Sequence, residues 1–451
     1  MTPFRALTRS ATSAFLLSAA VMLLPMGPAH AGGFILNEMS AASVGNAHAG
    51  GAAAAEDIST IYFNPAGLMR LPGRQFLIAG SAIRPSSRFE NRGSVSAVGT
   101  PLLGGNGGDA GSWAFVPALY YAMDLVPGLR FGIGLQSPFG LKTDYDAGWV
   151  GRYQALKSEL QSVNINPTLA YRLNEQISLG AGISLQYVNV ELSRAVDFGS
   201  ICVGSLGPAA CAPSGFLPQA RDGTATVKGN DWGYGFNLGI LFQPQENLRF
   251  GIAYRSSIKH DIEGDARFAR PAGLPAPLAA APTFADTGAR ASLDLPESLN
   301  VSGYMDIDSK WSVMADINWV RWNRFRELRV QFDNGAPDSV TPENWRNTVR
   351  VSAAVNYRYN DTWKLRAGVA YDQTPVVSEF RTARIPDADR TWLAFGAQYK
   401  PTRQDTWDFG YAHLFVRDAS INKAEPPVGG TLIGNYSNDV NILSVQYSRS
   451  F

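Results

Sequence analysis

Cysteine and charge are scarce in this chain of 451 residues. Only 2 cysteines are present, which excludes a disulfide-rich scaffold and a zinc cluster built from cysteines. Charged residues make up 17% of the chain, below the roughly 25% of an average soluble domain, and this deficit argues against an ordinary soluble enzyme. The formal net charge is +1, so the basic face of a nucleic-acid-binding protein is missing and no nucleic acid partner is expected.

Long apolar runs are also missing beyond the N-terminus. After residue 31 the sequence has no uncharged apolar run of the ~18–20 residues that a membrane-spanning helix needs. Glycine, by contrast, is abundant at 45 residues, and aromatic residues make up 11%. If the mature chain crosses a membrane, it does so with strands.

The first 31 residues have the three parts of a secretory signal peptide. Arg5 and Arg9 form a positive region, an apolar stretch covers 11–24, and Ala29-His30-Ala31 is a small-residue cleavage site. We predict removal of residues 1–31, so that the mature chain begins at Gly32; a retained anchor helix is the alternative. Export also places the two cysteines in an oxidising compartment.

Apolar and polar residues alternate along most of the remaining chain, as in strands with two different faces. The stretches 177–187 and 349–359 show the pattern clearly. Many of these segments are about twice as long as the ~5–6 residues usual for soluble strands. About fourteen strands are predicted, near 74–91, 112–124, 128–145, 157–173, 176–194, 225–243, 247–264, 289–306, 310–332, 345–359, 362–373, 389–400, 405–417 and 436–451.

The connections between these strands alternate in length, which separates a membrane barrel from a soluble sandwich. Short turns alternate with long loops near 93–111, 146–156, 195–224, 265–288, 333–343, 374–388 and 418–435. Short turns on one rim and long loops on the other are typical of outer-membrane barrels. Since lipid cannot satisfy an open sheet edge, residues 74–451 are predicted to form a closed all-β antiparallel transmembrane barrel. The terminal Phe451 resembles the signal read by the barrel-assembly machinery.

Residues 32–73 lack this alternation and are rich in small side chains. A solvated periplasmic tail is one interpretation. The other is a hatch, or plug, inside the barrel, because the stretch is too apolar to remain in water. The turn Asn64-Pro65-Ala66 lies near its end.

The N-terminal stretch contains three motifs: Gly33-Phe34-Ile35-Leu36-Asn37-Glu38, Gly45-Asn46-Ala47-His48-Ala49-Gly50 and Asn64-Pro65-Ala66. These motifs resemble the FadL/TodX/OmpP1 family of outer-membrane transporters of long-chain fatty acids and other hydrophobic molecules. The similarity covers 32–451 and is most specific in the N-terminal motifs and in 385–393, where the sequence reads IPDADRTWL. The family fold that this resemblance implies is a fourteen-stranded barrel with an N-terminal hatch in its lumen.

The resemblance implies a kink in the third strand that opens the barrel wall. The matching residues are Ser137, Pro138, Phe139 and Gly140. The residue types also favour a kink, since proline has no N–H to donate to the neighbouring strand and glycine permits a sharp bend. A turn that ends the strand early is the alternative.

Two further positions in the predicted hatch acquire roles from the same resemblance. The turn Asn64-Pro65-Ala66 is predicted to be a hinge or anchor, and Asn64 to bond the free backbone groups of the kinked strand. Phe34 matches a family phenylalanine at the edge of the interior binding pocket; packing within the plug is the alternative.

Arg194 matches a family position whose arginine meets the ligand carboxylate, and an arginine can bind a carboxylate through two hydrogen bonds. An arginine on the extracellular rim is the alternative. The family's second basic residue falls at Thr341 here, which leaves neutral hydrocarbons open as cargo.

The loops 195–224 and 265–288 are unusually apolar, and in the family such loops form a first capture site. Their predicted ligand contacts are Phe216, Leu217, Phe268 and Phe284. Cys202 and Cys211 are predicted to form a disulfide in the first loop, with two free thiols as the alternative.

These features predict a passive transporter of fatty acids or similar hydrophobic molecules in the Gram-negative outer membrane, monomeric and surrounded by lipid. Uptake of neutral hydrocarbons by the same fold and a water-filled porin are the alternatives. An enzyme is not expected, because no histidine lies in a hydrolase or metalloprotease motif. No cofactor or metal is expected.

Overall fold

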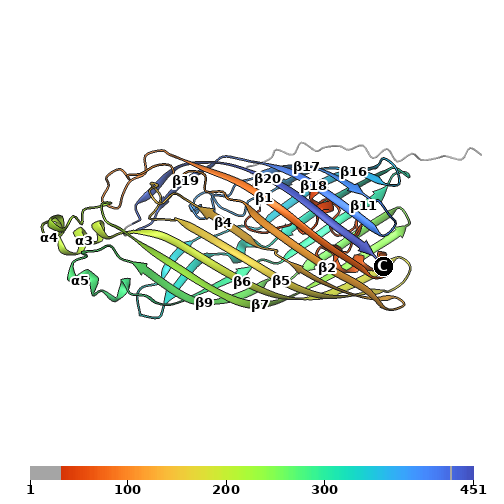
Figure 1. Cartoon of the computed structure of the whole chain (residues 1–451), viewed down its shortest axis with the longest axis horizontal. Helices are drawn as coiled ribbons and strands as arrows, with labels where there is room; N and C mark the ends of the chain where they lie inside the picture. Colours follow the sequence, from red (N-terminus) through yellow and green to blue (C-terminus); the bar gives the residue numbers. More distant parts are fainter. Residues whose placement is uncertain (1–31, 427–428) are drawn as a thin grey trace, which may run out of the picture.

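The computed structural model describes residues 32–426 and 429–451. The predicted signal peptide, residues 1–31, lies outside the described residues. In the described part of the chain, no helix is long and apolar enough to cross a lipid bilayer. The described residues form an elongated barrel, with short helices inside one half and beyond the opposite end (Figure 1).

Antiparallel strands form the wall, and the described residues close it into a ring. Twenty strand segments make fourteen wall strands, because six wall strands contain two segments each. Closure occurs where the first and last strands pair, from Gln75 opposite Ser450 to Asn91 opposite Gly434. The predicted fold class, a fourteen-stranded antiparallel barrel, is confirmed.

Eight wall strands are single segments: β1 (Gln75–Asn91), β2 (Ala114–Val126), β5 (Lys157–Arg172), β6 (Ile177–Asp197), β7 (Asp222–Gln245), β16 (Trp363–Asp372), β17 (Arg390–Tyr399) and β20 (Thr431–Ser450). The others are β3 (Leu129–Gln136) with β4 (Gly140–Asp144), β8 (Leu248–Arg255) with β9 (Ile258–Ala269), β10 (Thr287–Leu295) with β11 (Ser298–Asp306), β12 (Trp311–Val320) with β13 (Glu327–Phe332), β14 (Ser339–Pro342) with β15 (Thr348–Arg358), and β18 (Asp405–Val416) with β19 (Ala419–Ala424).

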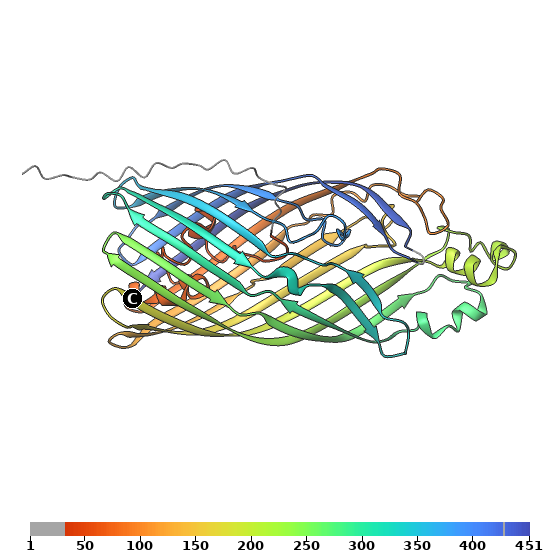
Figure 2. The ribbon, with the colours of Figure 1, turned by 180° about the vertical axis from the view of Figure 1, so that it is seen from behind.

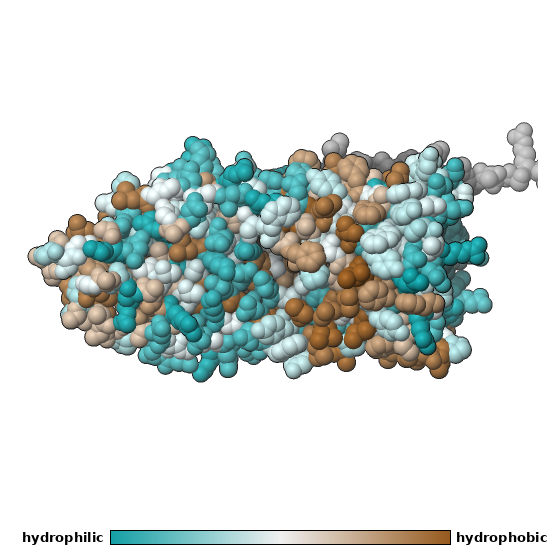
Figure 3. Space-filling model, in the orientation of Figure 1, coloured by the Kyte–Doolittle hydropathy of each residue, from teal (hydrophilic) through white to brown (hydrophobic). Residues whose placement is uncertain are grey.

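Alternation along each strand places apolar side chains outside and polar ones inside. In β16, Leu365 and Val369 are 46% and 51% exposed, whereas Arg366 between them is buried in the lumen. Apolar side chains gather over the part of the wall nearer the short turns, and the rest of the surface is more polar (Figure 3). An outer surface on which exposed large apolar side chains recur from strand to strand, here called the apolar belt, suits lipid contact rather than water.

Tryptophan–tyrosine pairs lie beside the short turns. Each pair joins neighbouring strands, with ring centroids 4.5 Å apart for Trp311–Tyr357, 4.7 Å for Trp363–Tyr399 and 4.9 Å for Trp407–Tyr447. Aromatic rings with an apolar body and a polar edge are typical of the girdle at a membrane–water interface. The short-turn rim therefore lies at one such interface.

At the opposite end the wall continues beyond the apolar belt and carries most of the remaining helices. Five of them lie in the long loops there: α3 (Phe198–Leu206), α4 (Pro208–Cys211), η2 (Ala212–Ser214), α5 (Ala276–Ala279) and η3 (Pro282–Phe284). The sixth, η4 (Trp322–Arg324), instead interrupts a wall strand between β12 and β13, where Trp322 packs against Phe34. The predicted loop 418–435 was wrong, since it contains β19 and the start of β20. A strand in this extension need not present an apolar face to lipid: in β19, Ala419 and Ile421 are buried, whereas Ser420 and Asn422 are exposed.

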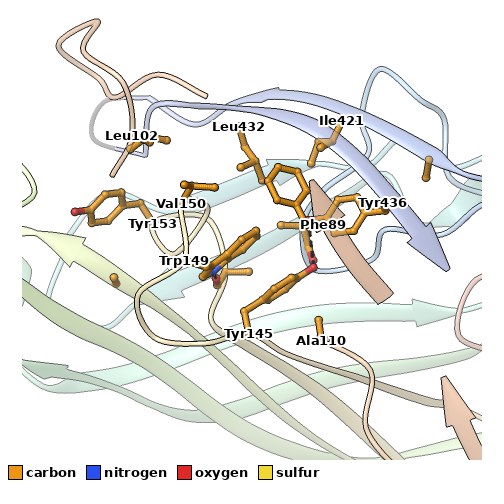
Figure 4. Packing of buried hydrophobic residues seen from close by; sticks show 14 of the residues in the cluster. Phe89, Leu102, Ala110, Tyr145, Trp149, Val150, Tyr153, Ile421, Leu432 and Tyr436 are labelled. Atoms are coloured by element: carbon orange, nitrogen blue, oxygen red, sulfur yellow. Dashed lines mark hydrogen bonds between the residues drawn. The ribbon is translucent and has the colours of Figure 1, made fainter. Parts of the chain in front are cut away.

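An aromatic cluster joins the long loops to the wall at this end (Figure 4). Trp149 stacks on Tyr145 with centroids 3.9 Å apart, and Phe89 of β1 packs edge-on against Trp149 at 5.6 Å. The Tyr145 hydroxyl donates to the carbonyl of Ala383 at 2.6 Å and lies 3.2 Å from the hydroxyl of Tyr436 in β20. The loops after β4 and β16 are thus held against β1 and β20.

Residues 32–73, here called the N-terminal segment, fill the bore in the half of the barrel nearer the short turns (Figure 2). The segment contains α1 (Ala41–Gly45), α2 (Thr60–Phe63) and η1 (Pro65–Arg70). Helix α1 lies against β17 and β18, and η1 lies against β6 and β7 on the opposite wall. Small residues permit this close packing, as where Gly45 meets Gly396 of β17.

Candidate functional site

The turn at Asn64 fixes the N-terminal segment to the wall. The Asn64 amide donates to the carbonyl of Ala52 at 2.6 Å and to that of Ile240 in β7 at 3.0 Å. Its Oδ1 accepts from the N–H of Ala66 at 3.1 Å and so caps η1. Wall glycines make room for the turn, since a side chain at Gly239 of β7 would overlap Asn64. The predicted bond from Asn64 to the kinked strand is wrong, because its wall partner lies on β7.

Asn64→Ala is expected to impair uptake while the barrel still assembles. The substitution removes one helix cap, worth about 1 kcal/mol, and leaves buried carbonyls unpaired at about 1–3 kcal/mol each. Labelled-ligand uptake and the amount of folded protein in outer membranes measure the two effects. Asn64→Asp keeps the cap acceptor but places a carboxylate oxygen against the carbonyls of Ala52 and Ile240, so it should impair uptake at least as strongly as Asn64→Ala. Normal uptake by well-folded Asn64→Ala contradicts an anchoring role.

A buried charge network holds the middle of the N-terminal segment. Glu56 accepts from Arg366 at 2.8 Å and from Lys364 at 3.1 Å, and Arg366 also pairs with Asp408 at 2.7 Å. Burial alone would raise the pKa of Glu56, but the two cations hold it below its ordinary value. Glu56 therefore stays ionised and ties the segment to β16.

The predicted kink residues, 137–140, lie at the break between β3 and β4. On one side of the break, Ser162 of β5 bonds both free backbone groups of Phe139. Its hydroxyl accepts from the N–H at 2.9 Å and donates to the carbonyl at 2.7 Å. On the other side the start of the N-terminal segment occupies the break. The N–H of Leu36 donates to the carbonyl of Pro138 at 2.8 Å, and that of Gly140 to the carbonyl of Phe34 at 3.0 Å.

Three adjoining cavities lie in the bore beyond the N-terminal segment. The largest, the inner cavity, has a volume of about 270 Å³. Its lining includes residues 32–38 of the N-terminal segment and, at the wall break, residues 138–143. The inner cavity therefore reaches the break from within.

The middle cavity has a volume of about 80 Å³ and a mostly apolar lining. Leu160, Ile262 and Leu293 are among its wall residues, and it shares Phe34, Leu141 and Ile385 with the inner cavity. The ring of Phe34 is buried, with centroids 4.8 Å from Trp322 and 5.6 Å from Trp345. Phe34 thus lies at the boundary between the two cavities.

The outer cavity, of about 70 Å³, brings Arg194 and Thr341 together with Phe268, Arg384 and Glu425. The guanidinium of Arg194 lies 3.7 Å from the Glu425 carboxylate. Arg194 therefore borders an internal cavity, although it already has an acidic neighbour. The outer and middle cavities share Arg384 and the apolar side chains of Leu192, Val227, Leu328 and Val330.

The two apolar loops pack against each other rather than standing open. Cys202 and Cys211 form a disulfide whose Cα atoms are 5.9 Å apart. Phe284 contacts Phe198 and Phe268, with centroids 5.0 and 6.1 Å apart.

The predicted ligand contacts in these loops differ in accessibility. The ring of Phe216 is completely buried in the packed loop cluster, so a ligand reaches it only if the loops rearrange. Leu217 is exposed at the surface.

The sequence interpretation missed several residues that line the bore. Trp322, Glu343 and Trp345 lie where two wall strands are interrupted, and Arg384 lies in the loop between β16 and β17; in both settings alternation carries no information. Arg384 directly precedes the specific stretch 385–393, which is the only signal that could have drawn attention to it.

A closed barrel with an apolar outer belt, an occupied bore and a row of internal cavities defines an outer-membrane transport barrel. The family model described as outer membrane protein transport protein (OMPP1/FadL/TodX) matches residues 23–451. The chain belongs to this family, and it is an outer-membrane protein of the Gram-negative type.

Relatives support the assignment along the whole length. The chain is 30% identical to the long-chain fatty acid transport protein of Escherichia coli O157:H7, covering 90% of this chain and 93% of the relative. It is 32% identical to outer membrane protein P1 of Haemophilus influenzae, covering 88% and 89%.

Solved structures show the same fold. The FadL homologue of Pseudomonas aeruginosa superposes with a TM-score of 0.85 at 24% identity, covering 93% of this chain and 100% of that chain. The Pseudomonas putida toluene transporter TodX gives a TM-score of 0.66 at 19% identity, covering 94% and 99%.

Proposed function

We propose that the protein transports long-chain fatty acids, or hydrophobic molecules of similar shape, passively across the outer membrane. The observation that carries the proposal is the row of adjoining cavities, which leads from Arg194 through an apolar middle section to the wall break at 137–140. A flexible alkyl chain fits a narrow apolar path of this kind better than a hydrated solute does.

In this proposal the N-terminal segment acts as a hatch. Phe34 to Leu36 occupy the wall break and also line the inner cavity, so one movement would open both. The ligand then leaves sideways through the break into the hydrocarbon layer, where an apolar molecule avoids water. No step requires an energy source beyond the ligand's own gradient.

Neutral hydrocarbons are the second candidate cargo, and Thr341 is the observation that favours them. A threonine at this position of the outer cavity supplies no cation for a carboxylate. The E. coli relative, named as a long-chain fatty acid transport protein, supports the acid instead.

An uptake assay tests the proposal. An E. coli strain that lacks its own long-chain fatty acid transport protein should regain labelled-oleate uptake and growth on oleate when this protein is expressed. The same cells are tested for labelled-toluene uptake. If folded protein restores toluene uptake but not oleate uptake, hydrocarbons are the cargo; if it restores neither, the proposal is wrong.

The proposed partners follow from the same setting. Outer-membrane lipid contacts the apolar belt, and the protein works as a monomer. Phe451, which is 70% exposed at the end of β20, is proposed to be read by the barrel-assembly machinery.

A further inference from the structure

Arg384 places a positive charge at the junction of the outer and middle cavities. In the part of the chain that the structure describes, its hydrogen-bond partners are all neutral. Nη1 donates to Oγ of Ser158 at 3.0 Å and to the carbonyls of Lys157 and Ser193 at 3.3 and 3.4 Å. Burial lowers the pKa of Arg384 to about 10, which leaves the guanidinium charged at neutral pH. A charge held away from water is costly unless an anion joins it.

The acids near Arg384 leave this charge largely uncompensated. Glu343 lines the middle cavity, but burial raises its pKa to about 8, so it is mostly protonated at neutral pH. Its carboxyl accepts from Nε1 of Trp345 at 2.9 Å. Glu425, in the outer cavity, is shared: it lies 3.7 Å from Arg194, and its charge also acts on Arg384, against the lowering of the pKa of Arg384 by burial. Two guanidinium groups therefore face this region with one ionised carboxylate between them.

The apolar side of the junction fits an alkyl chain. From Arg384 the middle cavity runs between Leu160, Ile262 and Leu293 to Phe34. Of the other cations that border the middle cavity, Lys228 and Arg290 have largely exposed side chains that pair with Glu191 and Asp333. A buried cation at one end of an apolar cavity matches an amphipathic anion, with its head at the cation and its tail along the walls. A neutral hydrocarbon would leave the cation unpaired.

We infer that Arg384 binds the carboxylate of a long-chain fatty acid and supplies the cation that Thr341 does not. The inference rests on the proposed function and names its substrate class. The carboxylate lies at the junction within reach of Arg384, with Arg194 as the second cation, and the alkyl chain occupies the middle cavity. A planar guanidinium can bind a carboxylate through two parallel hydrogen bonds.

Binding of an acid and of its neutral analogue tests this assignment. Purified mature protein in a non-ionic detergent is titrated with oleate and with oleyl alcohol, which share their chain and differ in head group. Arg384→Gln should weaken oleate binding roughly ten- to hundredfold, the effect of losing charge-assisted hydrogen bonds, and leave oleyl alcohol binding unchanged. Arg384→Lys, which keeps the charge, should retain most of the preference for oleate.

Arg381→Gln is the matched control in the same loop. Its guanidinium donates to the carbonyls of Asp387 and Ser420, and it lines none of the three cavities. This variant should bind oleate like the unmodified protein. Circular dichroism verifies that each variant keeps its strand content.

The outcomes separate this inference from the proposed function. If the unmodified protein binds both ligands and Arg384→Gln keeps the same preference for oleate, the role of Arg384 is wrong and the proposed function stands. If the unmodified protein binds only the alcohol, the cargo is neutral and the inference is wrong. If it binds neither, both are wrong.

Discussion

Cells that carry Ile35→Cys together with Phe139→Cys are expected to lose nearly all oleate uptake under oxidising conditions and to regain it on reduction. A disulfide between these positions fastens the start of the N-terminal segment to the wall break. Because Ile35 and Phe139 are directly opposed across this break, the bond would prevent the movement that the proposed lateral exit requires. Labelled-oleate uptake with and without a membrane-permeant reductant measures the effect.

The local backbone suits this crosslink. The two hydrogen bonds that flank the pair join Leu36 to Pro138 and Gly140 to Phe34, so Ile35 and Phe139 form a non-hydrogen-bonded antiparallel pair. Cα atoms in such pairs are about 4.5 Å apart, and disulfides span about 4.4–6.8 Å between Cα atoms. The bond can therefore form with little displacement of either segment.

Three controls isolate the effect of the crosslink. Each single cysteine variant should transport oleate with or without reductant. The unmodified protein must be tested with reductant too, because its own bond between Cys202 and Cys211 can be reduced. Full uptake by the oxidised double variant, with the new disulfide verified by mass spectrometry, would show that the segment need not leave the break.

The wall could be predicted from the sequence because lipid imposes a strict pattern on it. Each strand that crosses the apolar belt must alternate, as β16 does from Leu365 to Val369, so strand number and order could be read directly. Strand ends were less predictable. In the extension beyond the belt, strands such as β19 are short and expose their polar side chains, as Ser420 and Asn422 do, so they lack the long apolar face by which the other strands could be recognised.

The bore was harder to predict, because its contacts join residues that are distant in the chain. The small residues of 32–73 indicated a buried segment, but nothing local shows that Asn64 meets β7 and that Phe34 to Leu36 meet the break. Arg384 is similar. Its position beside Thr341 and Arg194 results from the curvature of the whole barrel, which no periodicity records.

Deletion of residues 34–70 is expected to convert a barrel that does not conduct ions into an open water-filled pore. The N-terminal segment spans the bore from β17 and β18 to β6 and β7, and so blocks the lumen. Its removal exposes inward-facing polar side chains, among them Arg366 and Asp408. A polar lining of this kind allows water to fill the lumen, as it does in porins. Single-channel conductance in planar bilayers should rise by about tenfold or more over the unmodified protein.

The wall should survive this deletion because its closure does not depend on the segment. The β1–β20 ladder that seals the ring consists entirely of contacts between wall strands, and Arg366 keeps its pairing with Asp408 after Glu56 is lost. Asn64→Ala, which keeps the segment in the bore, should remain non-conducting and serves as the control. If the unmodified protein conducts as strongly as the deletion variant, the bore is open in the native state. The protein then works as a diffusion porin, and the row of apolar cavities is not its transport path.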